Sequence, residues 1–272
     1  MRTVTPVMSH STVSVVVPTL NSARTVEACL RSVRAQTWTS VEVIVVDNSS
    51  RDATVEIAQS LADRVETWGP ERSAQRNRGW CLSHGAIVAF IDSDMVLEPE
   101  VLAEAVDVFT DHADTGVLVI PELACGVGFL ASCRALEKEL YVGDANVEAG
   151  RLFRREALHA VGGYDEALVA GEDWDLADRV VAAGWRTGRV SSVVWHDEGR
   201  ISLRRAFQKK RYYGRAMLPY MSAAARRRVP RPSLLRPDRL IEAPRQAAGL
   251  AVLKVVEAAG IGVGLAEQTL RG

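Results

Sequence analysis

The sequence of 272 residues contains few cysteines, and their spacing does not suit a zinc site or a redox pair. No Cys-x-x-Cys pattern joins any two of them. The four are Cys29, Cys81, Cys125 and Cys133. We therefore expect buried free thiols in preference to disulfides or metal ligands.

The N-terminal region does not read as a secretory signal. Only Arg2 precedes a short polar lead, and the first apolar run, Val13 to Val17, has the length of a strand and stops at Pro18. A signal peptide needs a basic start and a longer apolar stretch. We expect a cytoplasmic protein.

No charge sign dominates overall, because 33 basic and 34 acidic residues give a formal net charge of -1. With 47% hydrophobic and 25% charged residues, the chain is too apolar to be disordered. The charge is unevenly placed, however: residues 200–239 hold thirteen Lys or Arg and one acid, Asp238. Such a segment favours an anionic partner, which could be a membrane, a nucleic acid or a phosphorylated substrate.

Short β-branched runs alternate with helical stretches in the first third of the chain. Strands are expected at Val13–Val17, at Val41–Val46 and at Ala86–Ile91, and helices between them at about 21–34, 48–62 and 72–82. This rhythm predicts a mainly parallel central sheet flanked by helices, which is an α/β fold. Ligands of such sheets bind at the carboxyl ends of the strands.

Polar residues follow each of these runs. Thr19 and Asn21 come after the first, Asp47 ends the second, and Asp92-Ser93-Asp94 follows the third. Carboxylates at a strand end can hold Mg²⁺ or Mn²⁺ while leaving coordination positions for substrate phosphates. Each Asp alone could be an ordinary helix cap, but three at one edge favour a functional crevice.

Five ordered motifs carry a resemblance to a known family. They are Val-Val-Val-Pro-Thr-Leu-Asn (15–21), Val-Asp-Asn-Ser-Ser-x-Asp-x-Thr (46–54), Gln-Arg-Asn-x-Gly (75–79), Asp-Ser-Asp (92–94), and Gly-Gly-Tyr-Asp-Glu with Gly-Glu-Asp-Trp-Asp-Leu (162–166 and 171–176). Over roughly residues 13–197 the chain resembles the family 2 glycosyltransferases. The resemblance implies the GT-A fold of nucleotide-diphospho-sugar transferases and an inverting reaction.

The resemblance implies a donor site built from the strand ends. Contacts to the nucleotide-sugar would come from Pro18, Thr19, Asn21, Asp47, Arg76, Asp92 and Ser93. Arg76 would face the base or a phosphate, and Asp92 would touch the ribose. A carboxylate such as Asp47 is chemically suited to this role, because it accepts a hydrogen bond from a uracil N–H. A UDP-linked donor is the one expected first.

The resemblance also implies a metal site and a base. Asp94 would ligate Mn²⁺ or Mg²⁺, with His196, after an expected strand at 190–195, as a further ligand. Asp173 would take the proton from an acceptor hydroxyl, with Glu172 as its neighbour. Each of these acids could also simply stabilise the helix, because the helix dipole favours a negative charge in the first turn.

The C-terminal part, residues 200–272, is expected as a helical extension of a catalytic domain at 1–199. Arg204, Lys209 and Tyr212 belong to a basic, aromatic stretch that suits an interfacial helix, although a solvated face or a nucleic-acid grip would look similar. The following apolar stretch, Gly249–Leu265, contains Lys254 and Glu257, whose cost of about +2.5 to +3.5 kcal/mol each offsets its apolar residues. We expect it to lie on a membrane or to pack on the domain, with a membrane-spanning helix as the less favoured alternative.

The leading hypothesis is therefore a metal-dependent inverting glycosyltransferase acting on a hydroxyl of a glycan, lipid-linked or small-molecule acceptor. A nucleotidyltransferase also pairs carboxylates with a metal, but it should carry a Gly-rich loop after the first strand, and residues 19–25 contain no glycine. A protein that binds membranes or nucleic acid through its basic tail is the third reading; we expect no nucleic-acid partner. The donor sugar, the acceptor and the oligomeric state are not readable from the sequence.

Overall fold

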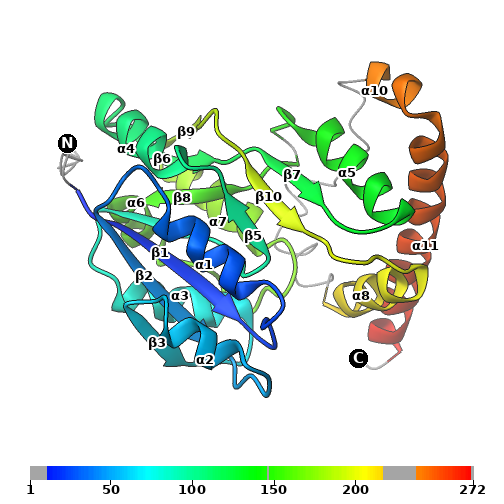
Figure 1. Cartoon of the computed structure of the whole chain (residues 1–272), viewed down its shortest axis with the longest axis horizontal. Helices are drawn as coiled ribbons and strands as arrows, with labels where there is room; N and C mark the ends of the chain where they lie inside the picture. Colours follow the sequence, from blue (N-terminus) through cyan, green and yellow to red (C-terminus); the bar gives the residue numbers. More distant parts are fainter. Residues whose placement is uncertain (1–10, 146, 217–236, 271–272) are drawn as a thin grey trace. The chain divides into compact units, whose positions relative to one another are not determined.

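The computed structural model describes residues 11–145, 147–216 and 237–270 and divides into two compact units (Figure 1). The first unit is formed by residues 1–121, 149–166 and 172–195, and the second by 122–148, 167–171 and 196–272. The change from one unit to the other falls within β10 (Val194–Asp197). The division into domains at 199 stays a prediction.

A seven-stranded sheet with the order β3-β2-β1-β4-β8-β6-β9 forms the centre of the first unit. Its strands are β1 (Val13–Thr19), β2 (Val41–Asp47), β3 (Arg64–Thr67), β4 (Ile87–Phe90), β6 (Thr115–Val119), β8 (Gly150–Arg154) and β9 (Arg186–Arg189). Among these seven strands, β8 alone is antiparallel to its neighbours, which are β4 and β6, and the other pairs are parallel. The mainly parallel sheet expected from the sequence is confirmed. A short strand, β5 (Met95–Leu97), pairs with β10 outside this sheet.

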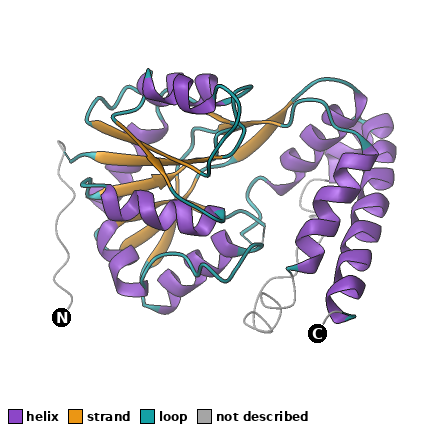
Figure 2. Cartoon of the chain, turned by 90° about the horizontal axis from the view of Figure 1, so that it is seen from below, coloured by secondary structure: helices purple, strands orange, loops and turns teal. Residues whose placement is uncertain are grey.

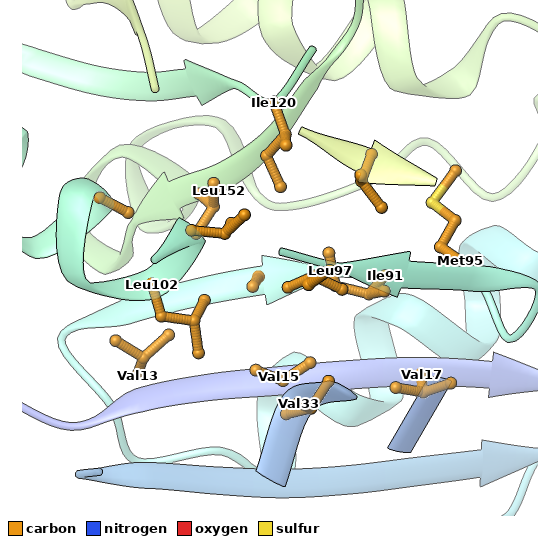
Figure 3. Packing of buried hydrophobic residues seen from close by; sticks show 14 of the residues in the cluster. Val13, Val15, Val17, Val33, Ile91, Met95, Leu97, Leu102, Ile120 and Leu152 are labelled. Carbon is orange, nitrogen blue, oxygen red and sulfur yellow. The ribbon is translucent and has the colours of Figure 1, made fainter. Parts of the chain in front are cut away.

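Helices cover both faces of the sheet (Figure 2). One face is covered by α1 (Val26–Arg34), α2 (Thr54–Gln59) and α4 (Val101–Asp111), and the other by α3 (Arg72–Leu82), α6 (Arg155–Val161) and α7 (Glu172–Ala182). Because side chains alternate along a strand, Val13, Val15 and Val17 pack into the first layer while Val16 packs into the second. Figure 3 shows the first of these two cores.

The first strand continues through Pro18, where the sequence predicts its end. Val16 O accepts a hydrogen bond from the Ile91 N–H, after β4, and Thr19 O accepts one from the Asn48 N–H, after β2. The backbone N–H and C=O groups of alternate β1 residues therefore point toward β4 and toward β2. Pro18 therefore faces the β4 side, where pairing ends at Val16 and Phe90. Its missing N–H costs no ladder hydrogen bond there.

Two other boundaries differ from those expected. The first helix begins at Val26, not near residue 21, because Asn21 adopts the left-handed backbone conformation (φ 51) and starts a loop. The run at 190–195 is not one strand, since β9 ends at Arg189 and β10 begins at Val194. None of the four cysteines, which all lie in the described residues, forms a disulfide, but Cys81 and Cys125 are exposed, not buried as expected.

The second unit consists mainly of helices. These are α5 (Phe129–Tyr141), α8 (Leu203–Arg215), α10 (Pro237–Glu242) and α11 (Pro244–Thr269), with one strand, β7 (Glu122–Cys125), beside β10. Helix α11 packs on α5 and α8 (Figure 1). Three consecutive arginines of the basic segment 200–239, Arg226–Arg228, lie outside the described residues.

Candidate functional site

The carboxyl ends of β1, β2 and β4 are joined by side-chain hydrogen bonds. Thr19 Oγ1 at the end of β1 donates to Asp47 Oδ1 at the end of β2 over 2.7 Å. Ser93 Oγ, after β4, lies 2.8 Å from Ser22 Oγ, after β1. The expectation that these residues share one edge of the sheet is confirmed.

Asp47 organises this edge from inside. It is 1% exposed, and its carboxylate accepts hydrogen bonds from the Thr19 hydroxyl, the Ser50 hydroxyl and the Ser50 N–H. Ser50 Oγ in turn accepts from the Asn21 N–H over 2.7 Å, and Asn21 Oδ1 accepts from the Arg51 N–H over 2.9 Å. The expected direct contact of Asp47 with a base is not supported in this conformation, because its oxygens are buried and engaged. Asp47 instead shapes the loops that carry Asn21 and Ser50.

Helix α3 is held against the strand ends by two residues of the Gln-Arg-Asn-x-Gly motif. A Cβ on Gly79 would lie 2.2 Å from a methyl group of Val16, so only glycine allows this close approach. One turn earlier, the Gln75 amide donates to the carbonyl oxygens of Thr19 (2.9 Å) and Val46 (2.6 Å). The motif therefore fixes where Arg76 lies.

Arg76 is fully buried and bridges three carboxylates. Its guanidinium donates to Asp92 Oδ1 at 2.6 Å, to Asp173 Oδ1 at 3.0 Å and to Glu172 Oε1 at 3.2 Å. The expected contact of Arg76 with a base or phosphate stays a prediction, because in this structure its guanidinium is buried and engaged with carboxylates. Its charge instead ties the loop after β4 to the start of α7.

Asp173 is held mainly through one oxygen. Oδ1 accepts hydrogen bonds from Arg76 and from the Tyr164 hydroxyl, each at 3.0 Å, whereas Oδ2 has Arg151 Nη1 at 3.7 Å. Tyr164 is fixed by Asn77, whose Oδ1 accepts from the Tyr164 N–H and whose Nδ2 donates to the Tyr164 carbonyl. The carboxylate is therefore oriented, with Oδ2 as the less tightly held oxygen.

The charges of this cluster shift the acidity of its members in opposite directions. Burial disfavours ionisation of Asp92, but the positive charges of Arg76, Arg151 and Arg72 outweigh it and lower the pKa of Asp92. Burial, with the neighbouring charge of Asp173, raises the pKa of Glu172 despite Arg76 and Arg72. One carboxylate is thus kept ionised beside another that resists ionisation, a combination typical of functional sites.

Three members of the cluster were not assigned a role from the sequence. Arg151 in β8 donates to Asp92 Oδ2 at 3.1 Å, Arg72 lies 3.2 Å from Glu172 Oε1, and Tyr164 donates to Asp173. Tyr164 belongs to a recognised motif and could have been singled out. Arg151 had no such signal, because β8 is distant in sequence and only the antiparallel β4–β8 pairing brings it to this edge.

The two expected metal ligands fall in different units. Asp94 follows β4 in the first unit, and its charge, like that of Asp92, acts on the buried Cys29 thiol, whose pKa is raised mainly by burial. His196 lies in β10 in the second unit, with Nδ1 2.7 Å from Glu122 Oε1, which also accepts from Lys138. A carboxylate on one ring nitrogen is the usual partner of a metal-binding histidine.

Within residues 11–145, 147–216 and 237–270, no three His, Cys, Asp or Glu side chains gather into a metal cluster. A site composed of protein ligands alone is therefore not formed by the described residues. Magnesium, however, is commonly bound by one or two carboxylates together with substrate phosphates. Asp94 fits that second arrangement, in which a diphosphate completes the coordination.

Solved structures of similar fold are glycosyltransferases of the GT-A type. A mannosyltransferase from Pyrobaculum calidifontis, solved with GDP-Man and Mn²⁺, matches with a TM-score of 0.62 at 22% identity, over 96% of this chain and 81% of that one. Residues 1–349 of S. aureus TarS, solved with UDP, match with a TM-score of 0.57 at 18% identity, over 95% and 90%. At these identities the likeness concerns the fold.

Residues 14–132 match the family model "Glycosyl transferase family 2". Glycosyltransferase AglE of Haloferax volcanii is 30% identical over 64% of this chain and 62% of its own length. The pre-mycofactocin glycosyltransferase of Mycobacterium tuberculosis is 30% identical over 78% of this chain and 48% of its own. The chain belongs to glycosyl transferase family 2, and it spans about half to three fifths of the length of these curated relatives.

Proposed function

We propose that this protein transfers a sugar from a nucleotide-diphosphate donor to a hydroxyl group, with inversion at the anomeric carbon and with the help of Mn²⁺ or Mg²⁺. The observation that carries the proposal is the oriented carboxylate of Asp173, tied by Arg76 to the loop after β4 that bears Asp94. Family membership supports the reaction class. The two structural relatives that carry UDP and GDP-Man support a nucleotide donor and leave UDP as our first choice.

In the proposed reaction, Asp173 Oδ2 takes the proton of the acceptor hydroxyl while that oxygen attacks the anomeric carbon. The bond from this carbon to the diphosphate breaks as the new bond forms, so the nucleoside diphosphate leaves with the electron pair. Arg76 and Tyr164 hold Oδ1 and so direct Oδ2 to the acceptor. A divalent cation beside Asp94, when bound, would offset the negative charge of the leaving diphosphate.

Donor recognition would use the accessible residues at the strand ends. Asn21 is exposed, while Ser93 and Asp94 are half-buried. We propose that these residues meet the nucleotide directly, and that Thr19 and Asp47 hold the loops in shape from beneath. His196, backed by Glu122, stays a proposed second metal ligand.

Release of nucleoside diphosphate tests the proposal. The full chain would be incubated with Mn²⁺ and a panel of sugar-nucleotides, with Asp94→Asn as the test variant and Asp107→Asn, an exposed change in α4, as its control. We expect turnover by the wild type and the control, and a loss of at least about a hundredfold in Asp94→Asn. Absence of donor binding and turnover for every nucleotide, or an Asp94→Asn variant of full activity, would overturn it.

The nucleotidyltransferase alternative gains no support from any residue of the described site. It predicts release of pyrophosphate, not of a nucleoside diphosphate, so the same experiment separates the two.

A further inference from the structure

Helix α11 turns three of its four charged residues toward its own unit, and the fourth, Arg245 in the first turn, is exposed. Lys254 and Glu257 form ion pairs with Arg134 and Glu137 of α5, and the Glu257 and Glu137 side chains are only 5% and 4% exposed. Near its C-terminal end, Glu267 pairs with Arg211 and Arg215 of α8. These pairs fix the rotation of α11 about its axis.

Glycines fix the same orientation by close packing. A Cβ on Gly260 would lie 2.6 Å from the Phe207 carbonyl oxygen, and one on Gly264 would overlap the backbone of Arg211. Both positions therefore face α8, and the two helices approach each other at their backbones. Gly262, between them, has no atom within 4 Å of such a Cβ and faces outward.

Between Ala248 and Ala266, the outward face of α11 consequently consists of apolar residues. The exposed positions along it recur every three or four residues, which is one side of a helix. They are Ala248, Ala251, Val252, Val255, Ala258, Ala259, Gly262, Val263 and Ala266. The side chains of Val252, Val255 and Val263 are 52%, 70% and 41% exposed. At 1.5 Å per residue this face is about 27 Å long.

A surface helix of a water-soluble domain normally shows the opposite pattern, with apolar residues inward and charges outward. Contiguous exposed apolar surface of this length marks a contact with a protein or a membrane. The charge of the neighbouring helix α8 indicates what contacts this apolar face. Helix α8 packs on α11 and contains five Arg or Lys residues ahead of its last turn and no acid. Arg204, Arg205 and Lys209 of α8 are exposed.

We propose that the second unit binds an anionic lipid bilayer, with α11 lying along the surface, its outward apolar face in the acyl region and the α8 cations at the headgroups. This is the arrangement of interfacial helices, in which apolar burial and attraction to anionic lipid act together. By length and composition α11 could also cross a membrane. Its paired charges toward α5 and α8 favour a parallel position.

A second copy of this chain is the main competing occupant. A two-fold contact through α11 would bring two α8 helices of the same charge toward each other, whereas an anionic bilayer offers the opposite charge. This difference in charge is why the lipid is preferred.

Vesicle co-sedimentation of the full chain tests the proposal. Phosphatidylcholine vesicles with and without phosphatidylglycerol would be compared for the wild type, for Val255→Asp and for Ile241→Asp, a control at an even more exposed residue on α10 (81%). We expect binding to anionic vesicles, a loss of at least about tenfold in Val255→Asp, and an unchanged control. The Arg204→Gln, Arg205→Gln double variant should bind about 25-fold more weakly, at about fivefold per cation.

Light scattering without lipid gives the mass of each variant. No binding by the wild type, or equal binding by Val255→Asp, would overturn the proposal. A dimeric wild type that Val255→Asp converts to a monomer would assign the face to a second copy and would also overturn it. Equal affinity for vesicles with and without phosphatidylglycerol would exclude the cationic part of the arrangement and with it the proposal. Circular dichroism confirms that each variant is folded.

Discussion

Arg76 is a single buried cation that holds Asp92, Glu172 and Asp173 at distances of 2.6 to 3.2 Å. Breaking a buried ion pair by removing one partner leaves charge without compensation, which costs about 3 to 5 kcal/mol. The same guanidinium orients the proposed base. Arg76 would therefore contribute both to stability and to the geometry of the proposed reaction, although it is fully buried in this structure.

We expect Arg76→Met to lower the free energy of unfolding at pH 7 by about 3 to 5 kcal/mol. The loss should shrink toward pH 5, because protonation relieves the repulsion among three carboxylates that have lost their cation. Urea unfolding at both pH values measures this. Arg78→Met, which removes a partly exposed arginine paired with Glu66, is the control and should cost less than about 1 kcal/mol. A loss that does not depend on pH would contradict the argument.

In the wild type, the ionised Asp92 stabilises the fold, so its contribution to the free energy of unfolding falls as the pH falls. Because its folded-state pKa lies below its unfolded value of about 3.9, its contribution is present above that pH and is lost as the pH falls toward the folded-state pKa. Unfolding midpoints measured from pH 6 down to pH 3 should fall more steeply for the wild type than for Asp92→Asn. Parallel curves for the two proteins would show that Asp92 does not contribute this pH-dependent stability.

In the proposed reaction, Tyr164 would affect turnover through its hydrogen bond to Asp173. Tyr164→Phe removes one of two hydrogen bonds on Oδ1, so we expect kcat to fall on the order of tenfold with KM for the donor unchanged. Tyr141→Phe, whose hydroxyl donates to Glu137 in the second unit, is the matched control and should leave kcat unchanged. Steady-state kinetics of both variants decide the matter, and equal effects would point to a merely structural role.

At the scale of elements, the packing of α11 on α8 depends on glycines of α11, and two substitutions in α11 test this dependence. Gly264→Ala should destabilise the protein by about 1 to 3 kcal/mol, because its Cβ overlaps the α8 backbone. Gly262→Ala should stabilise it by about 0.5 to 1 kcal/mol, because its site is open and alanine favours a helix. Denaturant unfolding of the two variants tests this difference in sign. Equal effects would mean that α11 does not pack on α8 as described.

Helix α3 shows how an element places a site. Gly79 lets the helix approach β1, and Gln75 donates hydrogen bonds to carbonyl groups at the strand ends. Arg76 is thereby placed next to the carboxylate of Asp92. The bounds expected for this helix, 72–82, are those of the structure. The burial of Arg76 was not predicted, because the sequence does not reveal how deeply a residue of this helix lies in the fold.

For the whole molecule, the second unit combines residues 122–148 with the C-terminal helices. Helix α5 packs Cys133, Leu136 and Leu140 around Leu250 of α11, and its Arg134 pairs with Glu257. A chain ending at residue 199, the boundary expected from composition, would leave this face of α5 uncovered.

We therefore expect residues 1–199 to aggregate or to bind a hydrophobic dye strongly, in contrast to the full chain at the same concentration. Size-exclusion chromatography and dye fluorescence measure this. A monodisperse fragment with the near-ultraviolet circular dichroism of a packed core would show that the catalytic domain is independent, as the composition suggested.

The sequence by itself determined the α/β fold, the order of strands and helices through residue 91 apart from the short β3, and the meeting of three strand ends at one edge. These follow from local periodicity and from the general geometry of parallel sheets. Only the tertiary structure decided that Asp47 and Arg76 are buried, that Arg151 reaches Asp92 from β8, and that α11 faces outward with its apolar side. Burial and long-range pairing depend on contacts between segments distant in the chain, and a residue type does not reveal which side of its element will be covered.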